Sequence, residues 1–234
     1  MQQKKEVKYR HELKYICTAA ELALIQGRIH HIISLDSHAG DDGMYHIRSL
    51  YFDDYNNRCF YENENGADPR EKFRIRIYNH SSERITLECK RKERGKTRKT
   101  SCPLTREQAE SLSQGKLLDL ADDQPPLLRK LILEMRTRHM RPVVIVEYER
   151  IPYIYKNGNV RITFDTQISS SSDTEHFLSD SISKRPVMPA GKHLIEVKFD
   201  EYLPDFIYRS LNLHQLQQTA YSKYYLCRKF SLNK

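Results

Sequence analysis

Residues 70–79 read REKFRIRIYN, and this stretch decides the fold that the sequence predicts. Its charged and apolar residues alternate, which is the period of a β-strand with one face in a hydrophobic core. The strand would carry its cations on one face (Lys72, Arg74, Arg76) and its apolar side chains on the other (Phe73, Ile75, Ile77). A sheet built from such strands has one apolar side and one strongly basic side.

The same alternation recurs on both sides of this stretch. It predicts further strands at residues 46–54, 83–92, 96–102, 142–155, 160–166 and 193–199. A polar turn at 79–82 and an Asn-Gly turn at 156–159 would each join two strands as a hairpin. Pro103 is expected to end its strand, and the serine-rich stretch 169–173 is interpreted as a disordered loop. The pattern indicates an antiparallel sheet.

Helices are fewer and lie between the strands or after them. They are predicted from capping boxes at Thr18/Glu21 and Thr105/Gln108 and from apolar spacing over 125–140 and 205–230, the last with a break near Asn212. No repeat or linker divides the chain. We therefore expect one domain over residues 1–234, an α+β fold in which helices surround the sheet.

The composition narrows the kind of protein. The chain has 234 residues, of which 38% are hydrophobic, and a formal net charge of +8. No apolar run reaches the roughly 18 residues of a membrane helix, and no signal-peptide core follows the N-terminus. Five cysteines without zinc-site spacing favour reduced thiols in a soluble, cytoplasmic protein. The excess of positive charge points to an anionic partner.

Several other predicted strands also carry charge on a single face. These faces hold Arg10, Glu12 and Lys14; Glu88, Lys90 and Lys92; Arg161, Thr163 and Asp165; and Glu196 with Lys198. Any one of them is typical of the solvated side of a sheet. Together they are biased towards Arg and Lys with a carboxylate nearby. If the sheet closes into a barrel, the cations line a basic cavity that suits a linear polyphosphate, and the carboxylates can hold a divalent metal.

Eight segments, taken in order, resemble the VTC-type polyphosphate polymerase domain of the triphosphate tunnel metalloenzyme (CYTH-like) superfamily. They are RHELKY at 10–15, SLYFDD at 49–54, KFRIR at 72–76, LECK at 87–90, EYER at 147–150, VRITFD at 160–165, LIEVK at 194–198 and SKY at 222–224. The resemblance implies a closed antiparallel tunnel barrel of about eight strands. It also implies an enzyme that uses Mn²⁺ or Mg²⁺ to transfer the γ-phosphate of ATP onto a growing polyphosphate chain.

The resemblance and the strand faces together assign roles to charged residues. The expected catalytic residues, which would hold the triphosphate along the tunnel, are Arg74, Arg76, Lys90 and Arg150. Further phosphate contacts are expected from Arg10, Lys14, Lys72, Lys99, Tyr148, Arg161, Lys198 and Lys223, with Lys96 or Arg98 as alternatives to Lys99. The candidate metal ligands are Glu196, which matches the family's carboxylate, and Glu12 and Glu88. No histidine is expected to be essential, because a phosphate nucleophile is already ionised at neutral pH.

One departure from the wider superfamily separates polymerase from hydrolase. Tunnel hydrolases usually begin with E-x-E-x-K, whereas this chain has Arg10-x-Glu12-x-Lys14. The missing carboxylate weakens a second metal site, and the added cation strengthens anion binding. This favours the polymerase over a metal-dependent tripolyphosphatase or a nucleoside or thiamine triphosphatase of the same fold.

Alternatives from other classes are a non-catalytic polyphosphate or nucleic-acid binding module and a fold that has lost its activity. The interleaved aromatic and basic residues at Tyr221–Arg228 would suit a nucleic-acid binder, but an exposed groove has no use for a metal carboxylate. We expect ATP and inorganic polyphosphate as partners, and no nucleic acid. The regulatory domain and membrane helices of eukaryotic relatives do not fit in 234 residues, so we expect a free-standing catalytic core. A membrane partner and the oligomeric state stay open.

Overall fold

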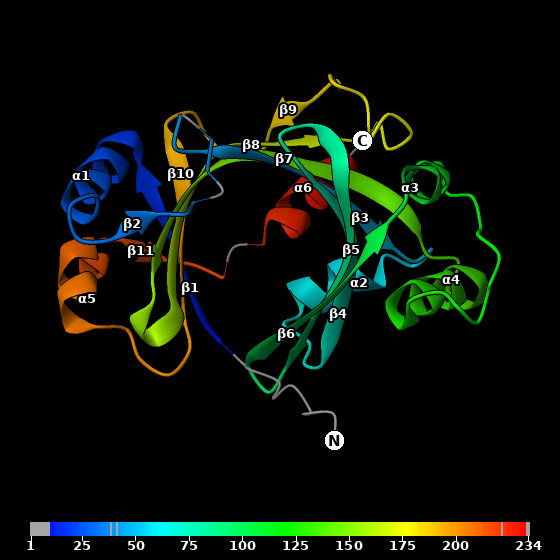
Figure 1. Ribbon diagram of the computed structural model, residues 1–234, viewed down its shortest axis with the longest axis horizontal. Helices are drawn as coiled ribbons and strands as arrows, with labels where there is room; N and C mark the ends of the chain where they lie inside the picture. Colours follow the sequence, from blue (N-terminus) through cyan, green and yellow to red (C-terminus); the bar gives the residue numbers. More distant parts are fainter. Residues whose placement is uncertain (1–9, 38, 41, 221, 233–234) are drawn as a thin grey trace.

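In the described part of the chain, an antiparallel sheet of eleven strands forms the centre of the computed structural model, and six α-helices pack against it (Figure 1). The structure describes residues 10–37, 39–40, 42–220 and 222–232; Tyr221 of the predicted C-terminal helix and the other residues of the expected 1–234 domain lie outside them. The strands are β1 (His11–Thr18), β2 (Ser34–Leu35), β3 (Tyr45–Asp53), β4 (Arg70–Tyr78), β5 (Ser81–Glu93), β6 (Lys96–Leu104), β7 (Arg141–Tyr155), β8 (Val160–Ser171), β9 (Arg185–Pro186), β10 (Lys192–Phe199) and β11 (Gln217–Gln218). The helices are α1 (Ala19–Ile29), α2 (Arg58–Glu64), α3 (Arg106–Ser113), α4 (Pro126–Arg138), α5 (Asp205–Leu211) and α6 (Lys223–Leu232), with 3₁₀ turns η1 (Asn157–Asn159) and η2 (Leu213–Gln215).

Hydrogen bonds join the strands in the order β11-β1-β10-β8-β7-β3-β4-β5-β6, and β2 and β9 pair with β7 and β8. All seven strands predicted from the alternation are present, and the face that carries Arg10, Glu12 and Lys14 forms the eighth long strand, β1, with its preceding bridge. Between β1 and β6, the described residues form one isolated bridge, Arg10 with Thr97. The hydrogen bonds therefore leave an open, arched sheet (Figure 1), and they do not close it into a barrel.

The register of the sheet brings the charged faces of neighbouring strands together. In β1 and β10, Lys14 pairs with Glu196. In β4, β5 and β6, Lys90 lies between Lys72 and Lys99. Because the side-chain period of a strand is two, every second residue of these strands follows on the same side. The side chain of Lys99 therefore points inward in β6, whereas those of the alternatives Lys96 and Arg98 point outward.

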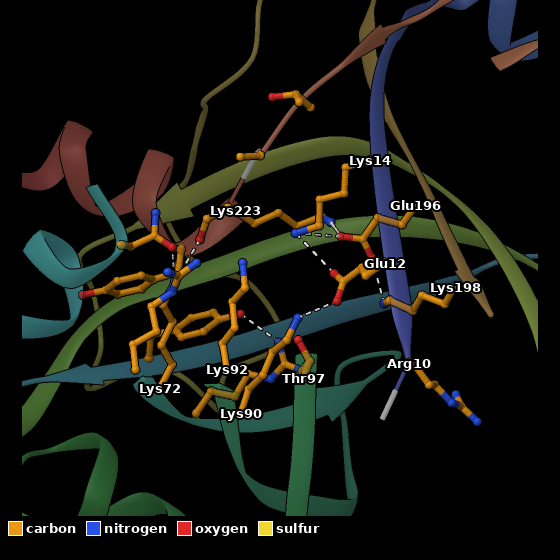
Figure 2. Close-up of a pocket in the computed structure, with 18 of the residues that line it drawn as sticks. Arg10, Glu12, Lys14, Lys72, Lys90, Lys92, Thr97, Glu196, Lys198 and Lys223 are labelled. Atoms are coloured by element: carbon orange, nitrogen blue, oxygen red, sulfur yellow. Dashed lines mark hydrogen bonds and ion pairs between the residues drawn. The ribbon is translucent and has the colours of Figure 1, made fainter. Parts of the chain in front are cut away.

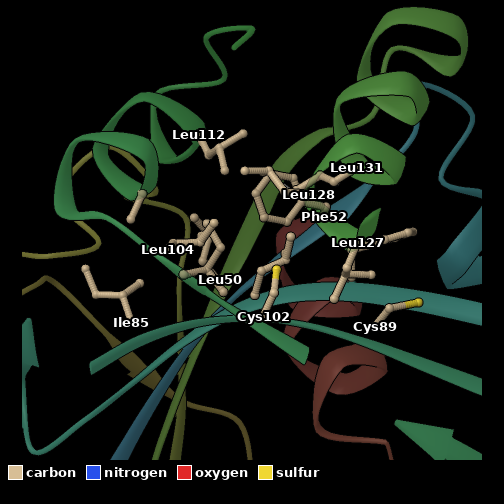
Figure 3. Packing of buried hydrophobic residues seen from close by; sticks show 14 of the residues in the cluster. Leu50, Phe52, Ile85, Cys89, Cys102, Leu104, Leu112, Leu127, Leu128 and Leu131 are labelled. Atoms are coloured by element: carbon tan, nitrogen blue, oxygen red, sulfur yellow. The ribbon is translucent and has the colours of Figure 1, made fainter. Parts of the chain in front are cut away.

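Two apolar clusters cover the outer face of the sheet. In the first, α3 and α4 bring Leu112 and Leu128 against Leu50 of β3 (Figure 3). In the second, Ile25 of α1 packs with Ile195 of β10. Burial of each such side chain contributes about 1.5–3 kcal/mol. Since the apolar faces must point outward to these helices, the charged faces point inward.

Beside α2, helix α6 packs on the inner face of the sheet. Its Tyr224 and Cys227 are buried together with Val146 of β7 and Leu194 of β10. The Tyr224 hydroxyl donates to the buried Asp53 carboxylate, which also accepts three backbone N–H groups at the turn into α2. This network fixes the first turn of α6 beside the inward-facing charges.

Two local predictions were wrong, a third was right only in part, and one helix was missed. Pro103 lies inside β6, because β6 is an outer strand whose free edge needs no N–H group there. Ser169–Ser171 are not a disordered loop; they are buried in β8, between β7 and β9. The predicted break near Asn212 is confirmed, since α5 ends there, but η2 and β11 separate α5 from α6, and α2 was not predicted. Within the described ranges, no helix combines the length and the hydrophobicity needed to cross a bilayer.

Candidate active site

A cavity of about 620 Å³ lies on the inner side of the sheet, and basic side chains dominate its lining. Eleven Lys and Arg side chains line it, against the carboxylates of Glu12 and Glu196. They come from β1, β4, β5, β7, β10 and the first turn of α6, so segments far apart in the sequence converge here. A concave surface with a formal excess of nine positive charges attracts anions strongly. We call it the cationic cavity.

Glu196 of β10 is the meeting point of four cations. Its carboxylate lies 2.9 Å from Lys198 Nζ, 3.0 Å from Lys223 Nζ, 3.3 Å from Arg150 Nη2 and 3.8 Å from Lys14 Nζ. Figure 2 shows the three lysines directed at it from β10, α6 and β1. Burial alone would raise the pKa of this carboxyl, but the four cations hold the pKa well below its usual value. These five residues, the Glu196 cluster, are therefore charged and held together without a ligand.

A second carboxylate, Asp165 of β8, supports two of these cations from outside the cavity lining. It is fully buried and accepts hydrogen bonds of 2.6 and 2.7 Å from the Arg150 guanidinium, and its Oδ2 lies 2.5 Å from Lys223 Nζ. Burial would lower the pKa of Lys223, but Asp165 and Glu196 raise it overall. A bidentate carboxylate also fixes the plane of the guanidinium. Both cations are thus positioned from two sides.

Glu12 of β1 connects Lys90 to the same network. Its carboxylate oxygens lie 2.8 Å from Lys90 Nζ and 3.3 Å from Lys14 Nζ. Lys14 therefore lies between Glu12 and Glu196 (Figure 2). Burial would raise the pKa of Glu12, but Lys90, Lys198 and Lys14 hold the pKa below its usual value. Glu12 is ionised as well.

Arg74 and Arg76 of β4 form another wall of the cavity. Arg74 contacts the Glu88 carboxylate through Nε at 2.7 Å and Nη2 at 2.6 Å, and it donates to the Tyr51 hydroxyl at 2.8 Å. Arg76 donates to the Tyr148 hydroxyl at 3.3 Å and lies 3.8 Å from Glu88. A guanidinium has five N–H donors, so both arginines keep donors for a ligand.

Lys72 of β4 has different neighbours. Its Nζ donates to Asn63 Oδ1 of α2 at 2.5 Å and to Ser222 Oγ at 3.2 Å, and it lies 5.1 Å from the centre of the Tyr224 ring. Burial first, and then the cations Arg70, Lys90 and Lys14, lower the pKa of Lys72 to about 7. We call Lys72, Asn63, Ser222 and Tyr224 the Lys72 cluster. At this point of the cavity, positive charge is not balanced by the protein.

The carboxylates in the cavity fit a divalent cation that arrives with phosphate. Glu12 and Glu196 are both ionised and both contact Lys14, so they lie on either side of one ammonium group. In the part of the chain that the structure describes, no three His, Cys, Asp or Glu side chains group as a complete metal site. Mg²⁺ and similar ions commonly use one or two carboxylates and take their other ligands from substrate phosphates and water. Two carboxylates in a cationic cavity match that pattern.

Most residues assigned from the sequence do line this cavity. They are Arg10, Glu12, Lys14, Lys72, Arg74, Arg76, Lys90, Tyr148, Arg150, Glu196, Lys198 and Lys223. Glu88 and Lys99 lie just outside the lining and bind each other at 3.0 Å, so Glu88 serves as a partner of cations and is apart from Glu12 and Glu196. Arg161 also lies outside the lining and pairs with Asp36 at 3.0 Å.

Several contributors were not singled out from the sequence. Asp165 shares the predicted inward face of its strand with Thr163, which was a usable signal. Asn63 and Ser222 lie on segments whose contact with β4 depends on how α2 and α6 pack, and no local pattern encodes that contact. Tyr51 stood in a segment that was quoted, but its hydroxyl contact with Arg74 depends on pairing between β3 and β4.

Comparison with known proteins agrees with this geometry. No curated protein sequence matches the chain. A putative adenylate cyclase from Bacillus halodurans has a similar structure, with a TM-score of 0.53 and 12% identity over 93% of this chain and 94% of that one. A putative adenylyl cyclase from Hippeastrum, described as having a dominant triphosphatase activity, has a TM-score of 0.56 and 13% identity over 96% of each chain. At such identities the similarity concerns the fold. The VTC domain family, however, matches residues 9–231, and the chain therefore belongs to that family.

Proposed function

We propose that this protein is an ATP-dependent polyphosphate polymerase that works in the cationic cavity. The observation that carries the proposal is the set of eleven cations and two carboxylates that line one cavity. Cations at this density repel one another, so a linear polyanion is the ligand that stabilises the cavity most. Phosphate oxygens suit both guanidinium forks and ammonium groups.

The chemistry needs positioning and charge stabilisation more than it needs a base. A terminal phosphate oxygen of the acceptor chain attacks the γ-phosphorus of ATP, the bond from that phosphorus to the β-phosphate oxygen breaks, and ADP leaves. Arg74, Arg76, Lys90 and Arg150 hold the phosphates in line and stabilise the charge that spreads over the transferred group. Tyr148 orients Arg76 through its hydroxyl.

Glu12 and Glu196 would hold a divalent metal ion, Mn²⁺ or Mg²⁺. When bound, such an ion neutralises charge on phosphoryl oxygens. The carboxylates are ionised before the ion arrives: burial would raise the pKa of both, but nearby cations, first Lys90 at Glu12 and Lys198 at Glu196, hold the pKa below its usual value. Lys14 would then lie beside the same two carboxylates as the metal ion.

A metal-dependent triphosphatase of the same fold is the second candidate. The Hippeastrum protein, described by its triphosphatase activity, supports this alternative. Arg10 argues against it, because a cation that pairs with Asp200 at 3.1 Å lies where hydrolases of the superfamily carry a carboxylate. A hydrolase must also activate water, whereas a phosphate chain already provides an ionised nucleophile.

The deciding experiment is to incubate the purified protein with ATP and Mn²⁺, with and without a short polyphosphate primer, and to resolve the products on a gel. A metal-dependent ladder that lengthens as ADP appears is the expected result. Free phosphate without a ladder would establish the triphosphatase instead. Tight binding of polyphosphate without either product would identify a binding module.

A further inference from the structure

A second cavity, of about 890 Å³, adjoins the cationic cavity, and we call it the outer groove. It shares Arg10, Glu12 and Gly95 with the cationic cavity, so the two lie side by side. Its other walls are the turn between β5 and β6, the turn between β7 and β8, and the chain that follows β10. A ligand held in the cationic cavity can extend into this groove.

The charge of the lining changes where the two cavities meet. In the cationic cavity, eleven cations outnumber two carboxylates. In the outer groove, three basic side chains, Arg10, Arg94 and Lys96, stand against the carboxylates of Glu12, Asp200 and Glu201. A phosphate chain that continued into this groove would gain no net attraction, because its cations and carboxylates are equal in number and Arg10 already pairs with Asp200 at 3.1 Å. The groove therefore suits a part of the ligand that has no charge of its own.

Tyr202 lines this groove and is held in a fixed position. Half of its surface is exposed, although its hydroxyl donates to Asn157 Oδ1 in the turn between β7 and β8. The Asp200 N–H also donates to the Gly158 carbonyl at 3.0 Å. Gly158 has φ +73°, and a Cβ there would lie 2.8 Å from the Tyr202 carbonyl oxygen, so the two segments are in close contact. An exposed ring held this firmly is suited to stacking.

The remaining side chains of the groove extend this chemistry. The His11 ring stacks on Phe199, with ring centres 5.1 Å apart, and gives a second flat surface. Carboxylates such as Asp200 and Glu201 accept hydrogen bonds from hydroxyl and amino groups. A flat heterocycle joined to a sugar with free hydroxyls combines both requirements.

We infer that the outer groove binds the nucleoside part of the triphosphate donor, with Tyr202 stacking on the base and the carboxylates of Asp200 and Glu201 accepting from the sugar hydroxyls. This inference rests on the proposed function, in which the cationic cavity holds the phosphates. It gives the donor an orientation, with its nucleoside at the Arg10 end of the cavity. It also gives the protein a means to prefer a nucleoside triphosphate over tripolyphosphate.

The test compares the affinities of β,γ-imido-ATP and tripolyphosphate by calorimetry for the full chain and its variants. Tyr202→Ala should weaken binding of the nucleotide about tenfold, which is about 1.4 kcal/mol, because it removes the stacking of the base, and it should leave tripolyphosphate within about twofold. Tyr202→Phe, which keeps the ring, should bind both ligands almost as the unaltered protein does. Tyr55→Ala is the matched control, since Tyr55 is 71% exposed and lines neither cavity.

The outcomes separate the subsite from the proposed function. If Tyr202→Ala weakens both ligands equally or neither, while the unaltered protein binds tripolyphosphate, the nucleoside subsite is wrong and the phosphate site stands. If the unaltered protein binds neither ligand, the proposed function fails and the subsite fails with it. Photolabelling with 8-azido-ATP gives an independent readout: the label should map to residues 199–204 or 94–96, and labelling confined to other segments would refute the assignment.

Discussion

The Glu196 cluster and the Lys72 cluster lie in the same cavity, yet they hold their cations in different ways. Four cations surround Glu196, and two of these also contact Asp165. Lys72 instead donates to the neutral oxygens of Asn63 and Ser222. Among the residues that the structure describes, no carboxylate lies within ion-pair distance of Lys72.

This difference separates preorganisation from attraction. The cations around Glu196 are charged and fixed before a ligand binds, because their carboxylates are buried with them. Burial and neighbouring cations lower the pKa of Lys72 to about 7. A bound anion therefore stabilises the charged form of Lys72 more than it stabilises the cations that are already paired. One cluster sets the geometry, and the other becomes fully charged when an anionic ligand binds.

The comparison assumes that both clusters face a phosphate chain held by the wall of Arg74 and Arg76. Replacing both arginines with alanine should abolish the hold on the phosphate chain. We expect this double substitution to have the largest effect of the substitutions considered. Removal of one fixed donor of this kind typically costs about 10²–10³ in rate, so we expect at least a thousandfold loss of ADP formation. Steady-state assays with ATP and Mn²⁺ would measure it.

The matched control for that variant removes two cations from the outside of the same sheet. Arg91 and Arg98 are paired neighbours on β5 and β6, and neither lines the cavity. Arg91→Ala with Arg98→Ala changes the net charge equally and should retain activity within about threefold, since exposed charges contribute little. If the two double variants lose activity to the same extent, the cavity is not the reaction site.

Glu196→Gln would make the Glu196 cluster resemble the Lys72 cluster. The four cations would lose their shared charge partner, and breaking a buried ion pair typically costs about 3–5 kcal/mol. We expect the free energy of unfolding to fall by about 3 kcal/mol in urea titrations. Saturating tripolyphosphate should restore part of it, because the ligand replaces the missing negative charge and binds only the folded state.

The exposed pair of Glu93 and Arg91 provides the control for this stability effect. Arg91 Nε lies 3.0 Å from Glu93 Oε2, but the Glu93 side chain is 41% exposed. Glu93→Gln should lower the free energy of unfolding by less than about 1 kcal/mol. A loss as small as this for Glu196→Gln would show that the carboxylate is not needed to hold the cations.

The Lys72 cluster should make polyphosphate binding depend on pH. The pKa of Lys72 is about 7 in the free protein and rises when a phosphate pairs with its ammonium group. Binding of polyphosphate therefore takes up a proton. The resulting gain in affinity is present below pH 7 and is lost as the pH rises through 7 and above. Between pH 7 and 8.5, this one group should weaken binding roughly tenfold.

Calorimetry at pH 8 in two buffers of different ionisation enthalpy would measure the proton uptake, which we expect to be close to one. The phosphate ligand titrates in this range as well, so the comparison must be made against Lys72→Met. That variant should bind more weakly at pH 7 and lose most of the uptake. Equal uptake by both proteins would exclude Lys72 as the group that takes the proton.

The sequence predicted the long strands because a half-buried strand repeats every two residues, as REKFRIRIYN does. The serine-rich composition of residues 169–173 predicted a disordered loop, but Ser169–Ser171 form a strand because they pair with β7, and Ser169 and Ser170 pair with β9 as well. Helix α2 begins after Asn57, which has φ 53° and makes no side-chain cap, so it lacks a start signal. Closure of the sheet depends on the geometry between β1 and β6, which no local pattern specifies.

For the site, strand parity placed the cations correctly on the inner face but did not show how far along the face the cavity extends. Lys198 and Arg161 illustrate this limit, because they are paired neighbours on β10 and β8 and both were predicted to bind phosphate. Only Lys198 lines the cavity. Arg161 is bound by Asp36, which follows β2, a strand that the alternation did not reveal.

This pair gives the smallest of the expected effects and the sharpest test of where the cavity ends. Lys198→Ala should weaken tripolyphosphate binding about tenfold, because it removes a cation 2.9 Å from Glu196 in the lining. Arg161→Ala should change the affinity by less than about twofold, since the Arg161 side chain is 42% exposed and already paired with Asp36. Calorimetry on both variants at one ionic strength would measure the contrast. Equal losses would mean that the phosphate chain reaches beyond the cavity to Arg161, and that the Glu196 cluster lies at the middle of the site and not at its edge.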